Sequence, residues 1–230
     1  MNIITGETTE NVETTSLRTQ SDVQTKVSKK VYIKIKRVID IILASIALIL
    51  LSPLFAIIAI AIKLDSKGPV FFAHKRIGKN GKIIKLYKFR SMVINAEELI
   101  KSFTPEQMKE YKENYKLTND PRITKVGKFL RKTSLDELPQ LINIINGDLS
   151  IIGPRPVIAD ELEKYGTNKD KFLSVTPGLT GYWAANGRSN TTYEQRMQME
   201  LFYIDNMSLK MDIKVFFKTI LSVVKKEGAM

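Results

Sequence analysis

Apolar residues run without a charged residue from Ile41 to Ile62, and this is the clearest hydrophobic pattern in the chain. A helix of about 20 apolar residues, at about 1.5 Å per residue, suffices to cross the roughly 30 Å hydrocarbon core of a bilayer. Pro53 stands near the middle of the run, however, and proline kinks or breaks a helix because it has no N–H to donate. The pattern therefore predicts two apolar half-helices that meet at Ser52 and Pro53.

Positive charges flank both ends of this run. They are Lys29, Lys30, Lys34, Lys36 and Arg37 before it and Lys63, Lys67, Lys75 and Arg76 after it. Positive residues prefer the cytoplasmic side of a membrane, so a spanning helix normally carries unequal charge at its two ends. The nearly equal flanks favour a re-entrant hairpin, with a kinked spanning helix and a buried helix of a soluble protein as the alternatives. At the turn of such a hairpin, the Ser52 hydroxyl is a candidate partner for freed backbone groups.

After the apolar run, the pattern predicts a small β-hairpin followed by polar helices. The dipeptide Asn80-Gly81 lies between two apolar runs, the second spanning Ile83 to Phe89, and this dipeptide is typical of a tight hairpin turn. A charged helical stretch follows over residues 95–103. A second helix, with Thr104 as its N-cap, is predicted to extend to about Lys116.

Ser134 is predicted to open a third helix, because Ser134 and Glu137 have the spacing of a capping box. Apolar residues at helical spacing follow, and Gly147 is placed to end this helix. Further along, Gly153–Pro156 is predicted to be an extended loop and Pro177–Gly181 a turn.

The last predicted helix carries its apolar residues on one face and lysines elsewhere. The apolar face consists of Ile213, Phe216, Phe217, Ile220, Leu221 and Val224. Such a face suits an amphipathic helix at a membrane surface and equally suits packing on a protein core. The sequence leaves both interpretations open.

These elements divide the chain into three parts and predict an α+β, mostly helical fold. Residues 1–28 are polar, lack aromatic residues and are predicted to be a disordered tail. They do not resemble a signal peptide, because the apolar run starts too late. Residues 29–66 form the predicted re-entrant membrane helix. Residues 67–230 have the size of one ordinary domain and include the amphipathic helix.

The composition of the chain limits the partners and the metal sites that can be expected. Lysine and arginine number 36 against 24 acidic residues, a net charge of +12 that suits nucleic acid, an anionic membrane surface or a phosphorylated substrate. The apolar run favours the membrane. There is no cysteine and one histidine, His74, so disulfide frameworks and thiolate or His-rich metal sites are not expected. Any metal is expected to be a hard ion such as Mg²⁺, held by carboxylates and phosphates.

Asp136 and Glu137 are the candidate reactive residues. Acidic residues in a first helical turn often only complement the helix dipole. Three arginines lie near this acidic pair in the sequence, namely Arg122, Arg131 and Arg155. The set is either a structural ion-pair network or a site where arginines bind phosphate oxygens while a carboxylate acts as nucleophile or holds Mg²⁺. No Walker A or GxGxxG motif is present, which disfavours a P-loop or Rossmann site.

Several longer motifs occur in an order that resembles one known family. They are Lys88–Met92, Asp120–Arg122, Leu130–Gln140, Gly147-Asp148, Gly153–Pro156, Pro177–Gly181 and Asn186–Arg188. By these motifs the chain resembles the bacterial sugar transferases, the monotopic polyprenyl-phosphate phosphoglycosyl transferases, over about Lys36 to Lys226.

The resemblance implies transfer of a sugar-1-phosphate from a UDP-sugar to undecaprenyl phosphate, with release of UMP, at the cytoplasmic face of the inner membrane. This step would begin capsule, exopolysaccharide or glycan assembly. Asp136 would be the nucleophile that carries a covalent phosphosugar, and Glu137 would assist with Mg²⁺ and the local charge, so that the acidic pair holds the metal. Residues 67–230 would then be the cytosolic catalytic domain.

The resemblance also implies further contacts. Arg131 and Arg155 match phosphate-binding positions, Lys88 matches a basic residue near the site, and Arg122 is expected to join them in binding the substrate phosphates. Gly187 and Arg188 are implied contacts of the nucleotide. The Ser52-Pro53 break matches that of a re-entrant helix in the family.

Physical chemistry supports a cation-rich site independently, because a carboxylate that attacks a diphosphate meets anion–anion repulsion. The helix expected to begin at Ser134 would add its positive dipole end beside the reacting phosphate. The segment Gly181–Ala185, which is bulkier at its start, and Glu200, in place of a frequent aspartate, depart from the common family pattern.

The remaining expectations concern one residue pair, Arg37 and Asp40, and the binding partners of the chain. Arg37 and Asp40, one helical turn apart, resemble a pair at the membrane end of the family's helix, with a simple surface salt bridge as the alternative. Anionic membrane lipids are expected partners, a homodimer is left open, and nucleic acid is not expected. The alternative function is a non-catalytic membrane scaffold for polysaccharide assembly.

Overall fold

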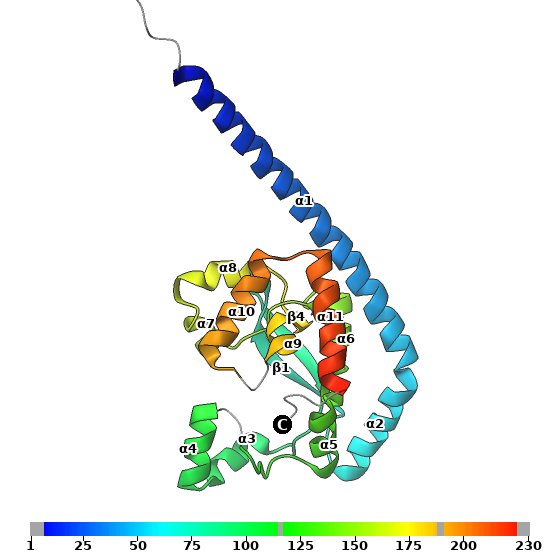
Figure 1. The fold of residues 1–230 in the computed structure, drawn as a ribbon. Coiled ribbons are helices and arrows are strands. Elements are labelled where there is room, and N and C mark those ends of the chain that lie inside the picture. The colour runs from blue at the N-terminus through cyan, green and yellow to red at the C-terminus, as the bar shows by residue number, and fades with distance from the viewer. Residues whose placement is uncertain (1–6, 115–116, 188–190, 225–230) are drawn as a thin grey trace, which may run out of the picture.

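The computed structural model describes residues 7–114, 117–187 and 191–224. Two helices joined by a bend form an arm, and the following elements build a globular part that lies along one side of it (Figure 1). The described residues contain mainly helices and two small two-stranded sheets. The predicted α+β, mostly helical class is therefore confirmed.

The first helix, α1, spans Glu7–Leu50. It begins inside the segment 1–28, so the structure has a helix over much of the stretch that the sequence predicted to be a disordered tail. No glycine or proline interrupts the chain from Glu7 to Leu50. Because a helix already formed gains one hydrogen bond for each residue added, such a segment readily extends it.

The predicted break lies at Ser52 and Pro53, where α2 (Ser52–Asp65) begins at an angle of 60° to α1. Ser52 Oγ donates a hydrogen bond of 2.8 Å to the carbonyl of Ile49. This carbonyl is the one that the N–H of residue 53 would bind in an unbroken helix, so the hydroxyl replaces the bond that proline cannot donate. In the described ranges, no single helix has the length and apolar character needed to cross a bilayer, whereas this bent pair meets both criteria together.

A narrow stripe of α1 packs on the globular part. The buried residues of this stripe recur every four positions and are Tyr32, Lys36, Asp40 and Ala44. Residues four apart lie on one helix face. Through this face α1 contacts α6 (Gln140–Asn146), and α2 contacts α5 (Lys125–Thr133), so that the arm curves around both helices (Figure 1).

Arg37 and Asp40 both contact the backbone of the globular part. The Arg37 guanidinium donates to the carbonyls of Ile144 and Ile145, where α6 ends. The Asp40 carboxylate accepts the backbone N–H of Ile151. Both side chains bond to backbone groups of the globular part, at the end of α6 and in β3, which fixes α1 to it.

The predicted hairpin is confirmed. Strands β1 (Phe71–Ile77) and β2 (Ile83–Phe89) are antiparallel, with Ile77 opposite Ile83. The turn η1 (Lys79–Gly81) places Asn80 and Gly81 at φ 55° and 78°. Asparagine and glycine tolerate this left-handed region better than other residues, which is why the dipeptide marks the turn.

The polar helices follow as predicted. They are α3 (Ala96–Leu99), η2 (Ile100–Ser102) and α4 (Pro105–Asn114). Thr104 Oγ1 accepts the N–H of Gln107, and Gln107 Oε1 accepts the N–H of Thr104, so the N-cap of α4 is a reciprocal capping box. The predicted end of this helix at Lys116 lies outside the described residues.

The predicted helix start at Ser134 is wrong. Ser134 adopts a left-handed conformation, φ 55°, and ends α5 without a side-chain capping bond. A single 3-10 turn, η3 (Leu135–Glu137), follows, and α6 begins only after Pro139. The left-handed residue stops α5 from continuing into η3, so η3 is a separate 3-10 turn and not the first turn of a helix capped by the Ser134 side chain. Gly147 ends α6 in a left-handed conformation, as predicted.

The segment Pro177–Gly181 is a strand rather than the predicted turn. Strand β4 (Gly178–Thr180) pairs in parallel with β3 (Ser150–Ile152). At Gly178 a Cβ atom would lie 2.1 Å from the backbone nitrogen of Gly153. The two glycines therefore permit a close backbone approach, which is a further role of glycine in strands.

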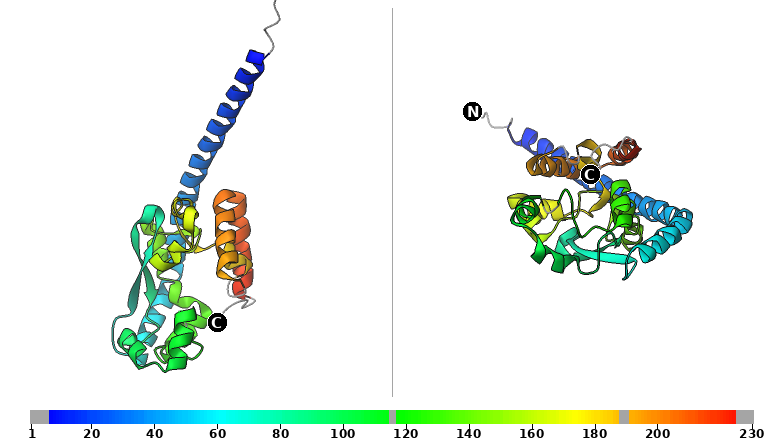
Figure 2. Two further views of the ribbon diagram at one scale, coloured as in Figure 1. Left: turned by 90° about the vertical axis from the view of Figure 1, so that its left-hand side faces the viewer. Right: turned by 90° about the horizontal axis from the view of Figure 1, so that it is seen from below.

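The C-terminal third is helical. Its helices are α7 (Ala159–Glu163), η4 (Gly166–Asn168), α8 (Lys169–Leu173), α9 (Tyr182–Asn186), α10 (Tyr193–Asp205) and α11 (Leu209–Val224). They pack around a core that includes Val157, Phe172 and Tyr203. The left view of Figure 2 shows α10 and α11 on one side of the globular part and the β1–β2 hairpin on the other.

The predicted apolar face of α11 points outward. Ile213, Phe217 and Leu221 are 57%, 59% and 57% exposed, whereas Val215 faces the core. Packing on the protein core, one of the two interpretations of this helix, is therefore wrong for the apolar face. The side chain of Val224 lies outside the described residues.

Candidate active site

Asp136 and Glu137 lie together in η3, directly after α5. Asp136 is buried, and the side chain of Glu137 is partly exposed. Burial raises the pKa of Asp136, which the charges of Lys88 and Arg131 oppose and the charge of Glu137 reinforces. The acidic pair is thus formed by one buried and one accessible carboxylate.

Lys88 comes from β2 and faces the acidic pair. Its ammonium lies 2.6 Å from Glu137 Oε1 and 3.9 Å from Asp136 Oδ2. The three residues converge because Lys88 lies in the last part of β2, which contacts η3. The structure therefore brings the predicted basic residue to both acidic side chains.

Arg131 projects from the last turn of α5. Its Nε donates a 2.9 Å hydrogen bond to Ser91 Oγ, and the residue remains exposed. Its charge also acts on the carboxyl of Asp136. Arg131 is consequently held beside the acidic pair.

Residues 88–91 link the acidic pair to the arm. Lys88 contacts the acidic pair, and the ring of Phe89 packs edge-on against Phe55 of α2 at 5.1 Å between centroids. Arg90 Nη2 donates to the carbonyl of Ser66 at 2.8 Å, just beyond the end of α2, and Ser91 accepts the bond from Arg131. Lys88 and Ser91 thus contact site residues, whereas Phe89 and Arg90 between them contact α2 and the segment just beyond it.

Arg122 is not free to bind a substrate phosphate. Its Nε and Nη2 donate to both carboxylate oxygens of Asp120, at 2.8 and 2.7 Å. The guanidinium also lies over the rings of Phe103 and Tyr111. This predicted substrate-binding residue holds the α3–α4 segment in place instead.

Arg155 belongs to a second cluster of charges. Its exposed guanidinium lies 5.9 Å from the ring centroid of Trp183. The other charged members of this arginine cluster are Arg76, Arg196, Glu161 and Glu200. The charges of both Arg155 and Glu137 act on Arg76, so this cluster extends toward the acidic pair.

His74 lies among the same cations. Burial, reinforced by Arg76, Lys88 and Arg155, lowers the pKa of His74 to about 4. The imidazole is therefore neutral at physiological pH, and it adds no charge to a region that is already strongly positive.

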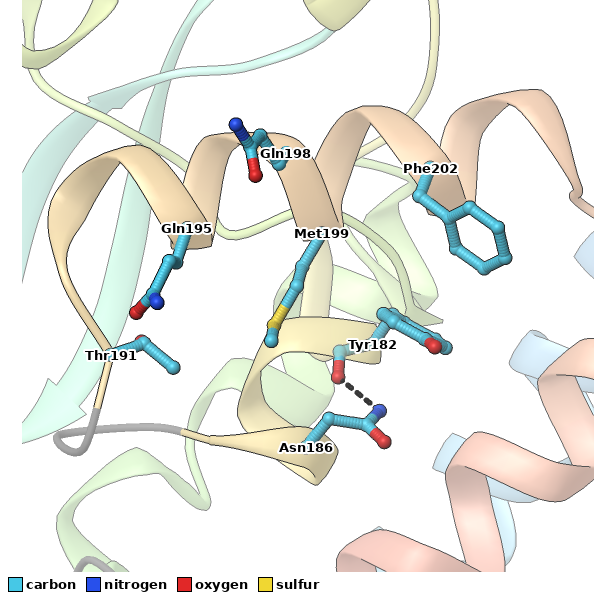
Figure 3. Close-up of a pocket in the computed structure, with 7 residues that line it drawn as sticks. All are labelled: Tyr182, Asn186, Thr191, Gln195, Gln198, Met199 and Phe202. Carbon is cyan, nitrogen blue, oxygen red and sulfur yellow. Dashed lines mark hydrogen bonds between the residues drawn. The ribbon is translucent and has the colours of Figure 1, made fainter.

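The predicted nucleotide contacts are only partly described. Gly187 is the residue that ends α9, and a Cβ there would lie 2.3 Å from Thr191 Cγ2. Arg188 lies outside the described residues. A separate hollow of about 580 Å³ occurs between α9 and α10 (Figure 3). It is lined by Tyr182, Asn186, Thr191, Gln195, Gln198, Met199 and Phe202.

The comparisons with known proteins agree on one family. The sequence profile described as "Bacterial sugar transferase" matches residues 31–226. The chain belongs to the bacterial sugar transferase family.

Three relatives illustrate this family. The chain is 42% identical over 210 residues to "Undecaprenyl-phosphate galactose phosphotransferase" of Salmonella typhimurium, covering 90% of this chain and 44% of the relative. It is 45% identical over 197 residues to "Exopolysaccharide production protein ExoY" of Rhizobium meliloti, covering 84% and 87%. It is 41% identical over 194 residues to "UDP-glucose:undecaprenyl-phosphate glucose-1-phosphate transferase" of Escherichia coli, covering 81% and 39%. The chain thus spans less than half the length of the first and third of these sugar transferases.

The acidic pair suits a hard cation. Among the described side chains, no group of three or more His, Asp or Glu residues is placed to hold a metal. Mg²⁺ is commonly bound by only one or two carboxylates together with substrate phosphates and water. The two adjacent carboxylates of Asp136 and Glu137 fit that arrangement.

Sequence reasoning missed Arg76, Glu161 and Arg196 as neighbours of the site. Arg196 and Glu200 stand one helical turn apart on α10, and their Nε and Oε1 atoms are 3.3 Å apart. This spacing is a recognisable signal for an ion pair. No pattern in the sequence around Arg196 and Glu200 indicates that this pair lies beneath the loop that carries Arg155.

Proposed function

We propose that this chain is a phosphoglycosyl transferase that moves a sugar-1-phosphate from a UDP-sugar to undecaprenyl phosphate and releases UMP. The observation that carries the proposal is the buried Asp136 carboxylate, held beside Glu137 and the Lys88 ammonium in a bacterial sugar transferase. The names of the Salmonella and E. coli relatives describe transfer to undecaprenyl phosphate, and that of the Rhizobium relative describes exopolysaccharide production. These names support a role at the start of capsule, exopolysaccharide or glycan assembly.

In the first half-reaction, a carboxylate oxygen of Asp136 attacks the phosphorus that bears the sugar. A bond forms between that oxygen and phosphorus, the bond from phosphorus to the bridging oxygen of the diphosphate breaks, and UMP leaves with its electron pair. Lys88 and Arg131 offset the charge that accumulates on the phosphoryl oxygens. Arg155 supplies a further cation to the donor phosphates.

In the second half-reaction, a phosphate oxygen of undecaprenyl phosphate attacks the same phosphorus. The acyl-phosphate bond breaks, the Asp136 carboxylate is restored, and the lipid leaves as a diphosphate-linked sugar. Glu137 is the accessible member of the acidic pair and can contact the incoming groups. Mg²⁺, held by Asp136 and Glu137 with substrate phosphates, would supply additional neutralisation of the phosphate charge.

The arm supports a location at the cytoplasmic face of the membrane. Outward-facing residues of α2 are strongly apolar, with Ile57, Ile60 and Leu64 64%, 61% and 83% exposed. The exposed apolar face of α11 adds a second lipid-facing surface. A re-entrant arm over residues 29–66, with the catalytic domain over 67–230 in the cytosol, would place the acidic pair near the level of the lipid phosphates.

The test is release of UMP from a panel of UDP-sugars by the purified protein with undecaprenyl phosphate and Mg²⁺. Wild type is expected to release UMP, and Asp136→Asn to release none. Asp170→Asn, an exposed acid on α8, is the matched control and should retain full activity. With a UDP-sugar and no lipid acceptor, mass spectrometry should find a sugar-phosphate adduct on the peptide that contains Asp136.

Each outcome decides a different part of the proposal. Activity of Asp136→Asn close to that of wild type would reject Asp136 as the nucleophile. If the folded wild type releases no UMP from any common UDP-sugar, the non-catalytic membrane scaffold becomes the better account.

A further inference from the structure

Glu200 is a carboxylic acid in the interior of the globular part. It lies in the middle of α10 and is only 2% exposed. Burying a carboxylate is costly unless its oxygens are paired and hydrogen-bonded. An apolar side chain of similar size would fill the same space without this cost, so the contacts of the carboxylate call for an explanation.

Three donors converge on this carboxylate. Oε1 accepts the backbone N–H of Arg155 at 3.1 Å and Nε of Arg196 at 3.3 Å. Oε2 accepts the hydroxyl of Tyr165, which is itself buried. Both oxygens are therefore engaged, and one of the three donors belongs to the loop that carries a predicted phosphate-binding residue.

The bond to Arg155 has particular weight because of the sequence around it. Arg155 stands between Pro154 and Pro156, and proline has no N–H. Within this tripeptide, the N–H of Arg155 is the only backbone donor, and Glu200 receives it. The carboxylate thus fixes the loop at the residue whose side chain faces outward.

A second path connects Glu200 to the guanidinium of Arg155. Arg196 bonds to Glu200 and also to Glu161 at 3.3 Å. Its guanidinium lies 4.8 Å from the ring centroid of Trp183, the same ring that lies next to the guanidinium of Arg155. Glu200 therefore supports both the backbone of Arg155 and, through Arg196, the aromatic ring beside its side chain.

We propose that Glu200 is a positioning residue that holds Arg155 in place to bind the phosphates of the donor. The proposal rests on the proposed function, since it assumes that Arg155 meets the donor diphosphate. Glu200 itself touches no reacting atom and acts through the loop Gly153–Pro156.

The experiment measures the dissociation constant of a UDP-sugar in the Asp136→Asn background, where the donor binds without reacting. Glu200→Gln keeps the shape of the side chain but loses its charge. Loss of a hydrogen bond to a charged group corresponds to roughly tenfold weaker binding. Glu163→Gln, an exposed acid paired only with Lys169 in the described ion pairs, is the matched control and should bind as the parent does.

A double-mutant cycle separates positioning from general stabilisation of the fold. If Glu200 acts through Arg155, adding Glu200→Gln to Arg155→Ala should weaken binding no further. Additive losses would overturn the proposal, and so would unchanged binding by folded Glu200→Gln. These outcomes are independent of whether wild type releases UMP, which tests the proposed function.

Glu200→Asp provides a second comparison if Glu200→Gln folds poorly. Aspartate keeps the charge but leaves a small void, whereas glutamine fills the space but lacks the charge. Binding closer to that of the parent for Glu200→Asp than for Glu200→Gln supports positioning by the carboxylate. The reverse order would show that Glu200 serves packing and would overturn the proposal.

Discussion

Removal of the Asp212 carboxylate is expected to weaken the attachment of α1 to the globular part. Asp212 lies on α11, and its Oδ2 accepts the Tyr32 hydroxyl at 2.8 Å and the Lys36 ammonium at 2.7 Å. Its Oδ1 accepts the Tyr203 hydroxyl at 2.6 Å. The Lys36 and Asp212 side chains are only 10% and 11% exposed, so the pair is buried between α1 and the globular part.

The loss of unfolding free energy in Asp212→Ala is estimated from these contacts. Removing one member of a buried ion pair costs about 3–5 kcal/mol, because the other charge remains buried without a partner. Loss of the hydrogen bonds from two tyrosine hydroxyls adds about 1 kcal/mol, so Asp212→Ala should lower the free energy of unfolding by about 4–6 kcal/mol. For a chain of this size, that corresponds to a decrease in Tm of roughly 8–24 °C.

The assay is thermal unfolding in detergent micelles, followed by circular dichroism. Asp205→Ala removes an acid whose side chain is 55% exposed and paired with Lys171, so it should cost less than about 1 kcal/mol. Replacing both members of the buried pair, as in Lys36→Met with Asp212→Leu, should cost less than Asp212→Ala alone. A Tm of Asp212→Ala within about 2 °C of wild type would refute the reasoning.

Three further results are expected. Burial raises the pKa of Asp136, and the charge of Lys88 opposes that shift. The value of kcat/KM should therefore fall as the pH decreases through this raised pKa, and Lys88→Met should move the fall to higher pH. Gly178→Ala should separate β3 from β4 and lower the Tm measurably, because its Cβ would meet backbone at 2.1 Å. Since the chain has no cysteine, a fluorophore on Phe217→Cys in lipid vesicles should be shielded from aqueous quenchers, and one on Lys214→Cys should be quenched.

The sequence correctly predicted those elements that depend only on residues close together in the chain. The turn at Asn80-Gly81 depends on backbone preferences of two residues, and the break at Pro53 depends on one missing N–H. The same reasoning was wrong at Ser134, because the left-handed end of α5 is compatible with a capping-box spacing and the sequence does not distinguish the two. It was also wrong for Gly178, whose strand exists only through pairing with a distant segment.

The candidate site likewise combines residues that the local sequence predicted with contacts that depend on the fold. Asp136 and Glu137 are neighbours in sequence and were predicted together, but the approach of Lys88 depends on the packing of β2 against η3. Arg122 was expected at the phosphates from its position in the chain alone. The bidentate bond to Asp120, two residues away, satisfies it instead.

The contacts of residues 88–91 have a consequence for how this stretch tolerates change. Substitution of Phe89 or Ser91 would remove one contact and leave the others in place. A one-residue deletion or insertion would instead turn each following side chain to the opposite side of the extended backbone. A shift just before Lys88 would turn Lys88 away from Glu137 and Arg90 away from the carbonyl of Ser66, so a change in length would affect the acidic pair and the arm together.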